Sequence, residues 1–237
     1  MAKNIKKRSA SHIYFGVNKL TGELKHISEV PSGQKCNCIC AACLQPFEAR
    51  KGTRRRHHFA HVSNYECMYA SEVAIYKAIA EALKQSGFLT LPPVMLRFPA
   101  WHDPELLQEA RRLKIDSVAF ECEPLSYPPL LRVTMQGTPL RILLDFDRYY
   151  DDDDRVELAE EAKVEDYSLL LISMPKIEQD TEFTPDRLQS ALQDNDRTEW
   201  VFSRLEEQWK QKYYAVAVSP PELSLIHISE PTRLQLI

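Results

Sequence analysis

The segment Cys38–Cys67 reads CICAACLQPFEARKGTRRRHHFAHVSNYEC and restricts the fold of this 237-residue chain more than any other segment. It holds four cysteines, three histidines and five Arg or Lys residues within thirty positions. Five of the six cysteines of the chain lie between Cys36 and Cys67. Because the chain shows no export signal, such a cluster indicates metal binding rather than disulfide bonds.

Two pairs of possible metal ligands lie at the ends of this segment. Cys40 and Cys43 form a C-x-x-C pair, and His61 is followed by Cys67 after five intervening residues. Zinc in structural sites takes four tetrahedrally arranged sulfur and nitrogen ligands. The spacing therefore predicts a structural zinc site with four protein ligands, which are Cys40, Cys43, His61 and Cys67.

His58 and Cys38 are the alternative ligands. Two residues three positions apart in a strand point to opposite faces, so we expect only one of His58 and His61 to bind the metal, and His61 is favoured. Cys36 and Cys38 alternate with Cys40 and share its face if the segment is extended. The competing interpretation is a cluster of reduced cysteines with buried histidines and no metal.

A group of cations separates the two ligand pairs. Gly52 lies in the middle of this group and indicates the tip of a hairpin. Cations at a rigid tip suit phosphate groups, because such contacts supply affinity and salt dependence without reading a base sequence. The residues predicted to bind nucleic acid are Arg50, Lys51, Arg54, Arg55 and Arg56. The competing interpretation is an exposed, solvated turn.

The charge of the chain is unevenly distributed. Residues 1–66 carry twelve Lys or Arg and four Glu, a net charge of +8, whereas the whole chain has a net charge of −4. A basic N-terminal part indicates a polyanionic partner, which we expect to be DNA. The basic start is not followed by an apolar signal region, and no stretch approaches the roughly 18–20 apolar residues of a membrane span. We therefore expect a cytoplasmic protein without a membrane partner.

The remainder of the chain alternates between predicted helices and strands. Apolar residues recur at helical spacing over Ala70–Gln85, and Ser86-Gly87 ends that helix. Strands are predicted at 13–17, 23–27, 90–98 (interrupted by two prolines), 116–123, 130–135, 140–146 and 168–173. Helices are predicted at 103–112 and 151–164, and a helix or helix pair at 185–213. This succession predicts an α/β domain with a mixed sheet.

Several motifs resemble those of the competence protein CoiA-like family. They are Thr21-Gly-Glu23, Ser28-Glu-Val30, the Cys38/Cys40-Ala-Ala-Cys43 run, Ala49-Arg-Lys-Gly52, His57-His-Phe-Ala-His61, Cys67, Ser71-Glu72 and, more loosely, Pro139-Leu140 and Trp200-Val-Phe202. The resemblance covers most of residues 13–205 and is most specific in 20–72. It implies a β-rich zinc-binding module followed by a restriction-endonuclease-like α/β domain, in a DNA-associated protein of DNA uptake and recombination.

With the two domains that this resemblance implies, we divide the chain into four parts. They are a basic arm at 1–12, the zinc-binding module at 13–68, the nuclease-like domain at 69–215 and a tail at 216–237. Within the tail, Leu223–Arg233 reads LSLIHISEPTR, which looks like a translated sequencing adapter. We therefore expect residues 223–237 to be an artefact, and to be disordered because they did not evolve with the core.

Nucleases of this kind hold Mg²⁺ with carboxylates on neighbouring strands, and the ion activates water for cleavage. One alignment with the family pattern uses the turn Gln136-Gly137. It places the expected Pro-Asp on Pro129-Leu130 and the expected Glu on Leu143, so that only Glu72 remains as a candidate carboxylate. Since leucine cannot bind magnesium, this alignment predicts a catalytically inactive member that binds nucleic acid or a protein.

A second alignment keeps a possible Mg²⁺ site. It combines Glu72 with Asp116, Asp145 and Asp147, but requires a longer connection between the strands. In this alignment the chain is a Mg²⁺-dependent nuclease, and these four carboxylates are its candidate catalytic residues.

Overall fold

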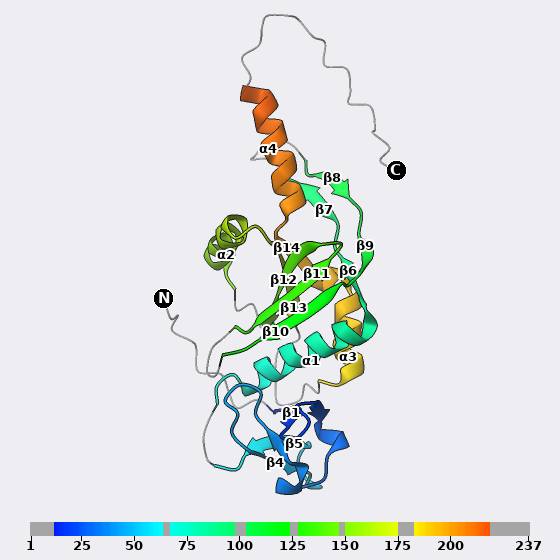
Figure 1. Cartoon of the computed structure of the whole chain (residues 1–237), viewed down its shortest axis with the longest axis vertical. Helices are drawn as coiled ribbons and strands as arrows, with labels where there is room; N and C mark the ends of the chain where they lie inside the picture. The colour runs from blue at the N-terminus through cyan, green and yellow to red at the C-terminus, as the bar shows by residue number, and fades with distance from the viewer. Residues whose placement is uncertain are drawn as a thin grey trace, which may run out of the picture.

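The computed structural model describes residues 12–63, 67–97, 103–123, 128–146, 150–174 and 183–218. The basic arm up to residue 11, Asp147 and the predicted artefact at 223–237 lie outside the described residues. Figure 1 shows the N-terminal strands at one end, the large sheet in the middle and the last helix projecting at the other end. None of the described helices combines the length and the apolar character that a membrane span requires.

The N-terminal part consists of short antiparallel strands. A three-stranded sheet has the order β2-β1-β3, and β4 pairs with β5. The strands are β1 (Phe15–Asn18), β2 (Leu24–His26), β3 (Cys38–Ile39), β4 (Phe47–Arg50) and β5 (His58–His61), with 3-10 helices at Ile27–Glu29 and Gln34–Cys36. The rings of Phe47 and Phe59 stack at 5.5 Å between β4 and β5. A Cβ at Gly16 would lie 3.1 Å from the Cβ of Cys38, so this close approach of β1 and β3 favours glycine.

The second part is built on a mixed sheet, as the sequence predicts. The strand order is β10-β11-β12-β13-β14, in which β12 and β13 are parallel and the other neighbours are antiparallel. The strands are β10 (Ser117–Glu121), β11 (Leu130–Met135), β12 (Thr138–Phe146), β13 (Ser168–Met174) and β14 (Thr198–Phe202). Gln136 and Gly137 both have positive φ, so they form the predicted tight turn between β11 and β12.

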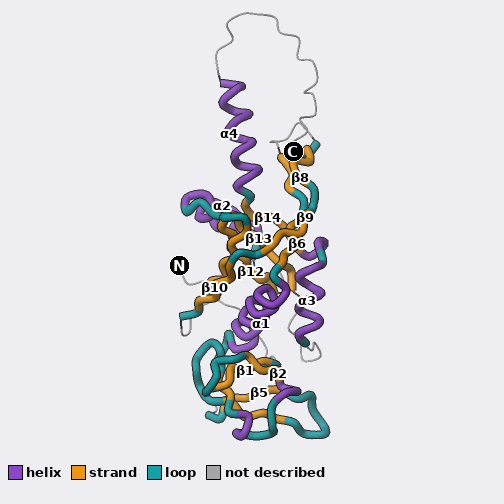
Figure 2. Tube along the Cα trace, turned by 45° about the vertical axis from the view of Figure 1, so that its right-hand side comes forward, coloured by secondary structure: helices purple, strands orange, loops and turns teal. Residues whose placement is uncertain are grey.

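Helices cover both faces of this sheet. α1 (Ala70–Ser86) packs on the face to which Ile142 and Leu144 belong, and α2 (Asp152–Val164) packs on the face of Leu143. α3 (Pro185–Gln193) lies beside α1, and α4 (Arg204–Val218) continues from β14 away from the sheet, as Figure 2 shows. The helix predicted at 70–85 is confirmed, and Gly87 ends it in the left-handed conformation.

The helix predicted at 103–112 is wrong. These residues form β8 (Glu105–Gln108) and the start of β9 (Arg111–Lys114). β8 pairs with β7 (Val94–Leu96), and β9 pairs with β6 (Phe88–Leu91). Long-range pairing supplies the backbone hydrogen bonds here and overrides the helical propensity of the local sequence.

The region 185–213 contains two helices, but a strand separates them. β14 lies between α3 and α4 and pairs with β13, and it thereby forms one edge of the sheet. Trp200 belongs to this strand, and its indole N–H donates to the carbonyl of Pro92 at 3.2 Å. The sequence Thr198–Phe202 is rich in aromatic and β-branched residues, which favour an extended conformation when a neighbouring strand is present.

Tyr76 connects α1 to the sheet through a hydrogen bond. Its side chain is fully buried, and its hydroxyl accepts a hydrogen bond from the backbone N–H of Leu144 at 2.7 Å. One cluster of buried residues runs from the N-terminal strands through α1 to the sheet, and it includes Phe59, Ile79 and Leu144. The two parts of the chain therefore share a continuous core around α1.

We expect Tyr76→Phe to lower the free energy of unfolding by about 1–3 kcal/mol, because it removes the hydrogen-bond partner of a buried N–H group. Urea unfolding followed by circular dichroism measures this change. The matched control is Tyr213→Phe on the exposed surface of α4, where we expect a change within about 0.5 kcal/mol. Equal losses in both variants would contradict this role of the Tyr76 hydroxyl.

Candidate metal centre

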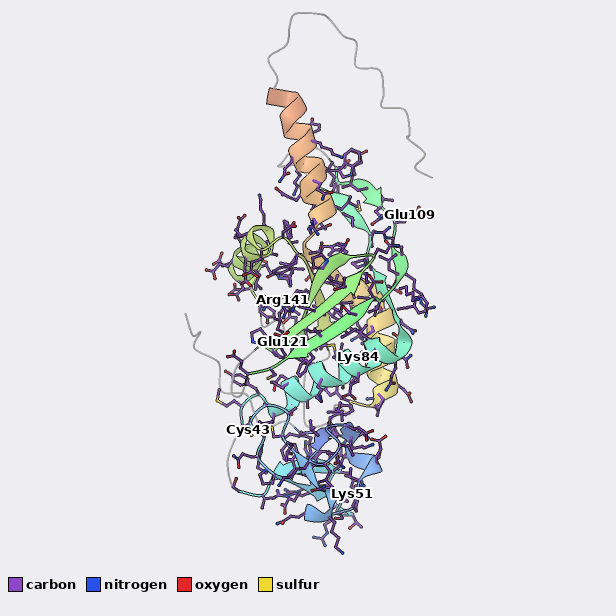
Figure 3. The ribbon with its side chains drawn as sticks, viewed as in Figure 1. Cys43, Lys51, Lys84, Glu109, Glu121 and Arg141 are labelled. Carbon is purple, nitrogen blue, oxygen red and sulfur yellow. The ribbon has the colours of Figure 1, made fainter. Side chains whose placement is uncertain are left out.

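Four potential metal ligands meet where the N-terminal strands adjoin the start of α1. Each offers one ligand atom, and these atoms all lie within 4.8 Å of one another; the four residues are Cys40, Cys43, His61 and Cys67. Figure 3 shows Cys43 at this junction. In the described part of the chain, no other group of three or more His, Cys, Asp or Glu residues is arranged in this way. Three thiols and one imidazole are a donor set that can hold a metal ion such as zinc.

The first pair of ligands lies in a tight turn after β3. The backbone N–H of Ala42 donates to the sulfur of Cys40 at 3.4 Å, and the N–H of Leu44 donates to the carbonyl of Cys40 at 3.0 Å. Leu44 has a φ of 60°, a conformation that closes the turn. The turn therefore brings the sulfurs of Cys40 and Cys43 close together. The N–H of Ala42 points at the Cys40 sulfur, which would carry a negative charge as a metal ligand.

His61 is the last residue of β5. Its Nε2 lies 3.2 Å from the sulfur of Cys43, and its ring contacts the ring of Phe47 edge-on at 4.8 Å. Burial lowers the pKa of His61 below its ordinary value of 6.5. The imidazole is therefore neutral at physiological pH, which is the form that binds metals.

Cys67 brings the fourth ligand from the segment that leads into α1. Its carbonyl accepts a hydrogen bond from the N–H of Ala70, the first residue of the helix, at 3.4 Å. A hydrogen bond from Cys40 lowers the pKa of Cys67 to about 6 and raises that of Cys40. A metal ion held by this set would connect three segments, which are the turn after β3, the end of β5 and the start of α1.

The two alternative ligands lie outside the cluster. His58 is on the opposite face of β5 from His61, where its Nδ1 is 2.9 Å from the carbonyl of Arg56 and its ring contacts His12 at 4.6 Å. Cys38 donates through its thiol to the carbonyl of Cys36 at 3.2 Å. Burial raises the pKa of the Cys38 thiol to about 12. Its position excludes it from the site, because its sulfur does not belong to the group of converging ligand atoms.

The cation group lies in the loop between β4 and β5, and its members differ in their contacts. Arg50 pairs with Glu48 at 2.8 Å, and Lys51 donates to the carbonyls of Ser28 and Val30. Lys51 therefore holds the base of the loop, a role that the sequence did not indicate. Figure 3 shows Lys51 at the end of the molecule opposite α4.

Arg54 and Arg55 have no partner of this kind among the described residues. Both are exposed, and neither has a hydrogen bond or an ion pair within the described ranges. With Arg50, Arg56 and His58 they line a shallow hollow on the surface of the loop. The structure thus presents several guanidinium groups around one concave surface.

The candidate carboxylates do not come together. Asp116 is exposed and accepts a hydrogen bond from the N–H of Gly137 at 3.0 Å, beside the β11–β12 turn. Asp145 lies on β12, eight residues after Gly137, which is roughly 26 Å away at the rise of an extended strand. Asp145 also shares the sheet face of Leu143, on which α2 packs, whereas Glu72 belongs to α1 on the other face. Both Asp145 and Glu72 are 3% exposed.

The register of the sheet places the two leucines of the first alignment opposite each other. Leu131 pairs with Ile142, and the same register puts Leu130 opposite Leu143. Leu143 is fully buried and packs with Leu169, below α2. The position that the first alignment gives to the expected glutamate is therefore occupied by a leucine of the apolar core.

Two charged residues around Asp145 were not singled out from the sequence. Arg155 of α2 lies 4.0 Å from Asp145 and 2.6 Å from Glu199 of β14. Sequence reasoning placed residue 199 in a helix, so no local signal indicated that these three residues meet. The arrangement balances the buried Asp145 carboxylate with a cation.

No model of a known protein family matches the sequence, and no curated protein matches it either. The interpretation of the chain therefore depends on its motifs and on the geometry described above. Within that geometry, the cysteine–histidine cluster is the arrangement with the clearest chemical capability.

We expect Cys40→Ser to lose the metal and Cys38→Ser to retain it, although both cysteines are buried. Only Cys40 belongs to the group of four ligands. The protein with intact ligands should carry about one metal ion per chain. Elemental analysis after gel filtration measures this content, and equal metal content in the two variants would contradict the assigned ligand set.

We also expect metal affinity to fall as the pH decreases through the pKa of His61, which lies below 6.5, and through that of Cys67 at about 6. All four ligands bind in their deprotonated forms, and the pKa values of Cys40 and Cys43 are raised. Affinity therefore falls over the whole range as the pH decreases, and it falls more steeply once His61 and Cys67 are protonated as well. Competition with a chromogenic chelator between about pH 8 and about pH 5 measures the change. Affinity that increases toward low pH would contradict this mechanism.

Proposed function

We propose that the chain is a zinc-stabilised DNA-binding protein of CoiA-like type, and that it has no nuclease activity of its own. The observation that carries the proposal is that the ligand atoms of Cys40, Cys43, His61 and Cys67 lie within 4.8 Å of one another. The arginine-rich loop between β4 and β5 lies in the chain between Cys43 and His61. This convergence agrees with the motifs of the family resemblance. The resemblance suggests a role in DNA uptake or recombination in the cytoplasm.

The proposed metal has a structural role. Four protein ligands fill a tetrahedral zinc site and leave no open position for a substrate. In the sequence, the loop between β4 and β5 lies between the two ligand pairs, since Cys43 precedes β4 and His61 ends β5. Zinc at this place would hold both strands and so keep the loop in one conformation.

The proposed DNA contact is made by the loop. Arg54 and Arg55 extend into solvent, while Lys51 holds the base of the loop through two backbone carbonyls. Guanidinium groups bind phosphate oxygens in a bidentate manner, and a concave group of them suits a phosphate backbone. No acidic residue lines this hollow among the described residues, so it favours an anionic partner.

The proposed lack of catalysis depends on the sheet. The family pattern for cleavage falls on Leu130 and Leu143, and Leu143 is fully buried. The alternative proposal, Mg²⁺-dependent cleavage, would require Asp145 with Glu72 and Asp147. Against it stand the position of Glu72 on the other face of the sheet and the guanidinium of Arg155 beside Asp145, which competes with a divalent cation.

The proposal is tested with fluorescently labelled duplex DNA. We expect Arg54→Gln/Arg55→Gln to weaken binding, and to reduce the slope of log affinity against log salt concentration by about two, because each lost phosphate contact accounts for about 0.9. The matched control, Lys19→Gln/Lys35→Gln, removes two exposed cations of the same part of the chain outside the loop. Binding that is equally weakened by both pairs would contradict the proposed loop contact.

The same samples test the absence of catalysis. With Mg²⁺ present, we expect the labelled DNA to remain intact over hours for the original chain and for Asp145→Ala. Cleavage by the original chain that is lost in Asp145→Ala would overturn the non-catalytic assignment and support the nuclease alternative. DNA binding by the loop does not depend on that outcome.

A further inference from the structure

A second concave surface lies at the far end of α1 from the metal centre. It is formed where the end of α1 meets β6, β9 and α3. Its functional groups are an aromatic ring, a guanidinium, two amides and two hydroxyls, which belong to Phe88, Arg112, Gln189, Gln193, Ser86 and Thr90. Among the described residues that line it, none is acidic. We call this surface the α1–α3 groove.

Phe88 and Arg112 form a stacked pair at this groove. The Phe88 side chain is 43% exposed, and the Arg112 guanidinium carbon lies 4.6 Å from the centre of its ring. Arg112 pairs with Thr90 in the β6–β9 ribbon, so it shares the face of Phe88 two residues away. Flat bases stack both on phenylalanine rings and on arginine guanidinium planes.

Two glutamines face this pair from α3. Gln189 and Gln193 are four residues apart and therefore lie on one side of the helix. Both are exposed, and neither has a hydrogen-bond partner within the part of the chain that the structure describes. A side-chain amide offers a donor and an acceptor together, which matches the edge of a nucleobase.

A further cation lies on the same face of the ribbon. Lys114 pairs directly with Phe88 across the two strands, so its side chain lies on the same face as Phe88 and Arg112. A ligand whose planar part fills the groove would therefore meet positive charge next to it.

We propose that the α1–α3 groove binds an unpaired nucleotide. The base stacks on the Phe88–Arg112 pair, the amides of Gln189 and Gln193 bond to its edge, and Arg112 and Lys114 bind its phosphate. The nucleotide can belong to a single DNA strand or be a free mononucleotide, since both carry the same base and phosphate groups. This site is separate from the arginine loop, and its argument does not depend on the DNA contact proposed there.

The full-length chain with Phe88→Trp reports on the groove directly. Base stacking quenches tryptophan fluorescence, and the signal of the three native tryptophans is subtracted with the unsubstituted chain. We expect quenching by an unlabelled oligothymidylate of about 12 nucleotides, a length within the range of known single-strand sites. Titration with thymidine monophosphate in a parallel sample distinguishes the two sources of the nucleotide.

Two further variants test the contacts. Phe88→Leu keeps the apolar side chain but loses the ring, and we expect it to weaken binding of the labelled oligonucleotide about 5- to 150-fold, the range for loss of one stacking platform. Arg112→Gln should weaken binding and lower the salt slope by about 0.7. The matched control is Arg111→Gln, which removes an equally exposed charge on the opposite face of β9 and should leave affinity unchanged.

Each result has a defined meaning. Quenching by the oligonucleotide that is weakened by Arg112→Gln but not by Arg111→Gln supports a strand-binding groove, and quenching by the mononucleotide alone supports a free nucleotide as the ligand. Absence of quenching by both, or equal affinity of Phe88→Leu and the unsubstituted chain, overturns the proposal. If only the arginine-loop variants reduce DNA binding, the groove proposal fails while the proposed function stands.

Discussion

The arrangement of the N-terminal part depends on four side chains that meet at one point. Cys40, Cys43, His61 and Cys67 come from three separate segments, and their ligand atoms lie within 4.8 Å of one another. Polar ligands are costly to bury without a partner, so such a convergence is favourable when a metal ion satisfies all four. The free energy of metal binding then becomes free energy of folding, which compensates for the small apolar core that such short strands can form.

α1 connects the N-terminal part to the remainder of the molecule. Its first turn follows Cys67, its middle is fastened to β12 by Tyr76, and its last turn borders the α1–α3 groove. Buried residues on both sides of the helix form one continuous cluster. The two surfaces proposed to bind nucleic acid lie at different places: one is on the β4–β5 loop, and the other is beside the end of α1.

Sequence patterns predicted the elements whose signals are local. The helix over 70–85 has a clear apolar period and a glycine after its end, and the β11–β12 turn has the positive φ values of Gln136 and Gly137. The segment 103–112 was predicted wrongly, and the strand Thr198–Phe202 was missed within a helical region. Both form strands because distant strands supply their hydrogen bonds, which no local pattern records.

By itself, the sequence restricted the possible metal ligands. The C-x-x-C spacing indicates Cys40 and Cys43, and the odd separation of His58 and His61 places these two histidines on opposite faces of a strand. Both restrictions follow from local geometry alone. Only the tertiary structure decided which charged groups meet. It places Asp116 beside the β11–β12 turn, far from Asp145, and it brings Arg155 close to Asp145. It also brings Lys51 to two backbone carbonyls, and Phe88 and Arg112 to the glutamines of α3. The physical reason is that these encounters depend on strand register and on helix packing, which join residues far apart in the chain.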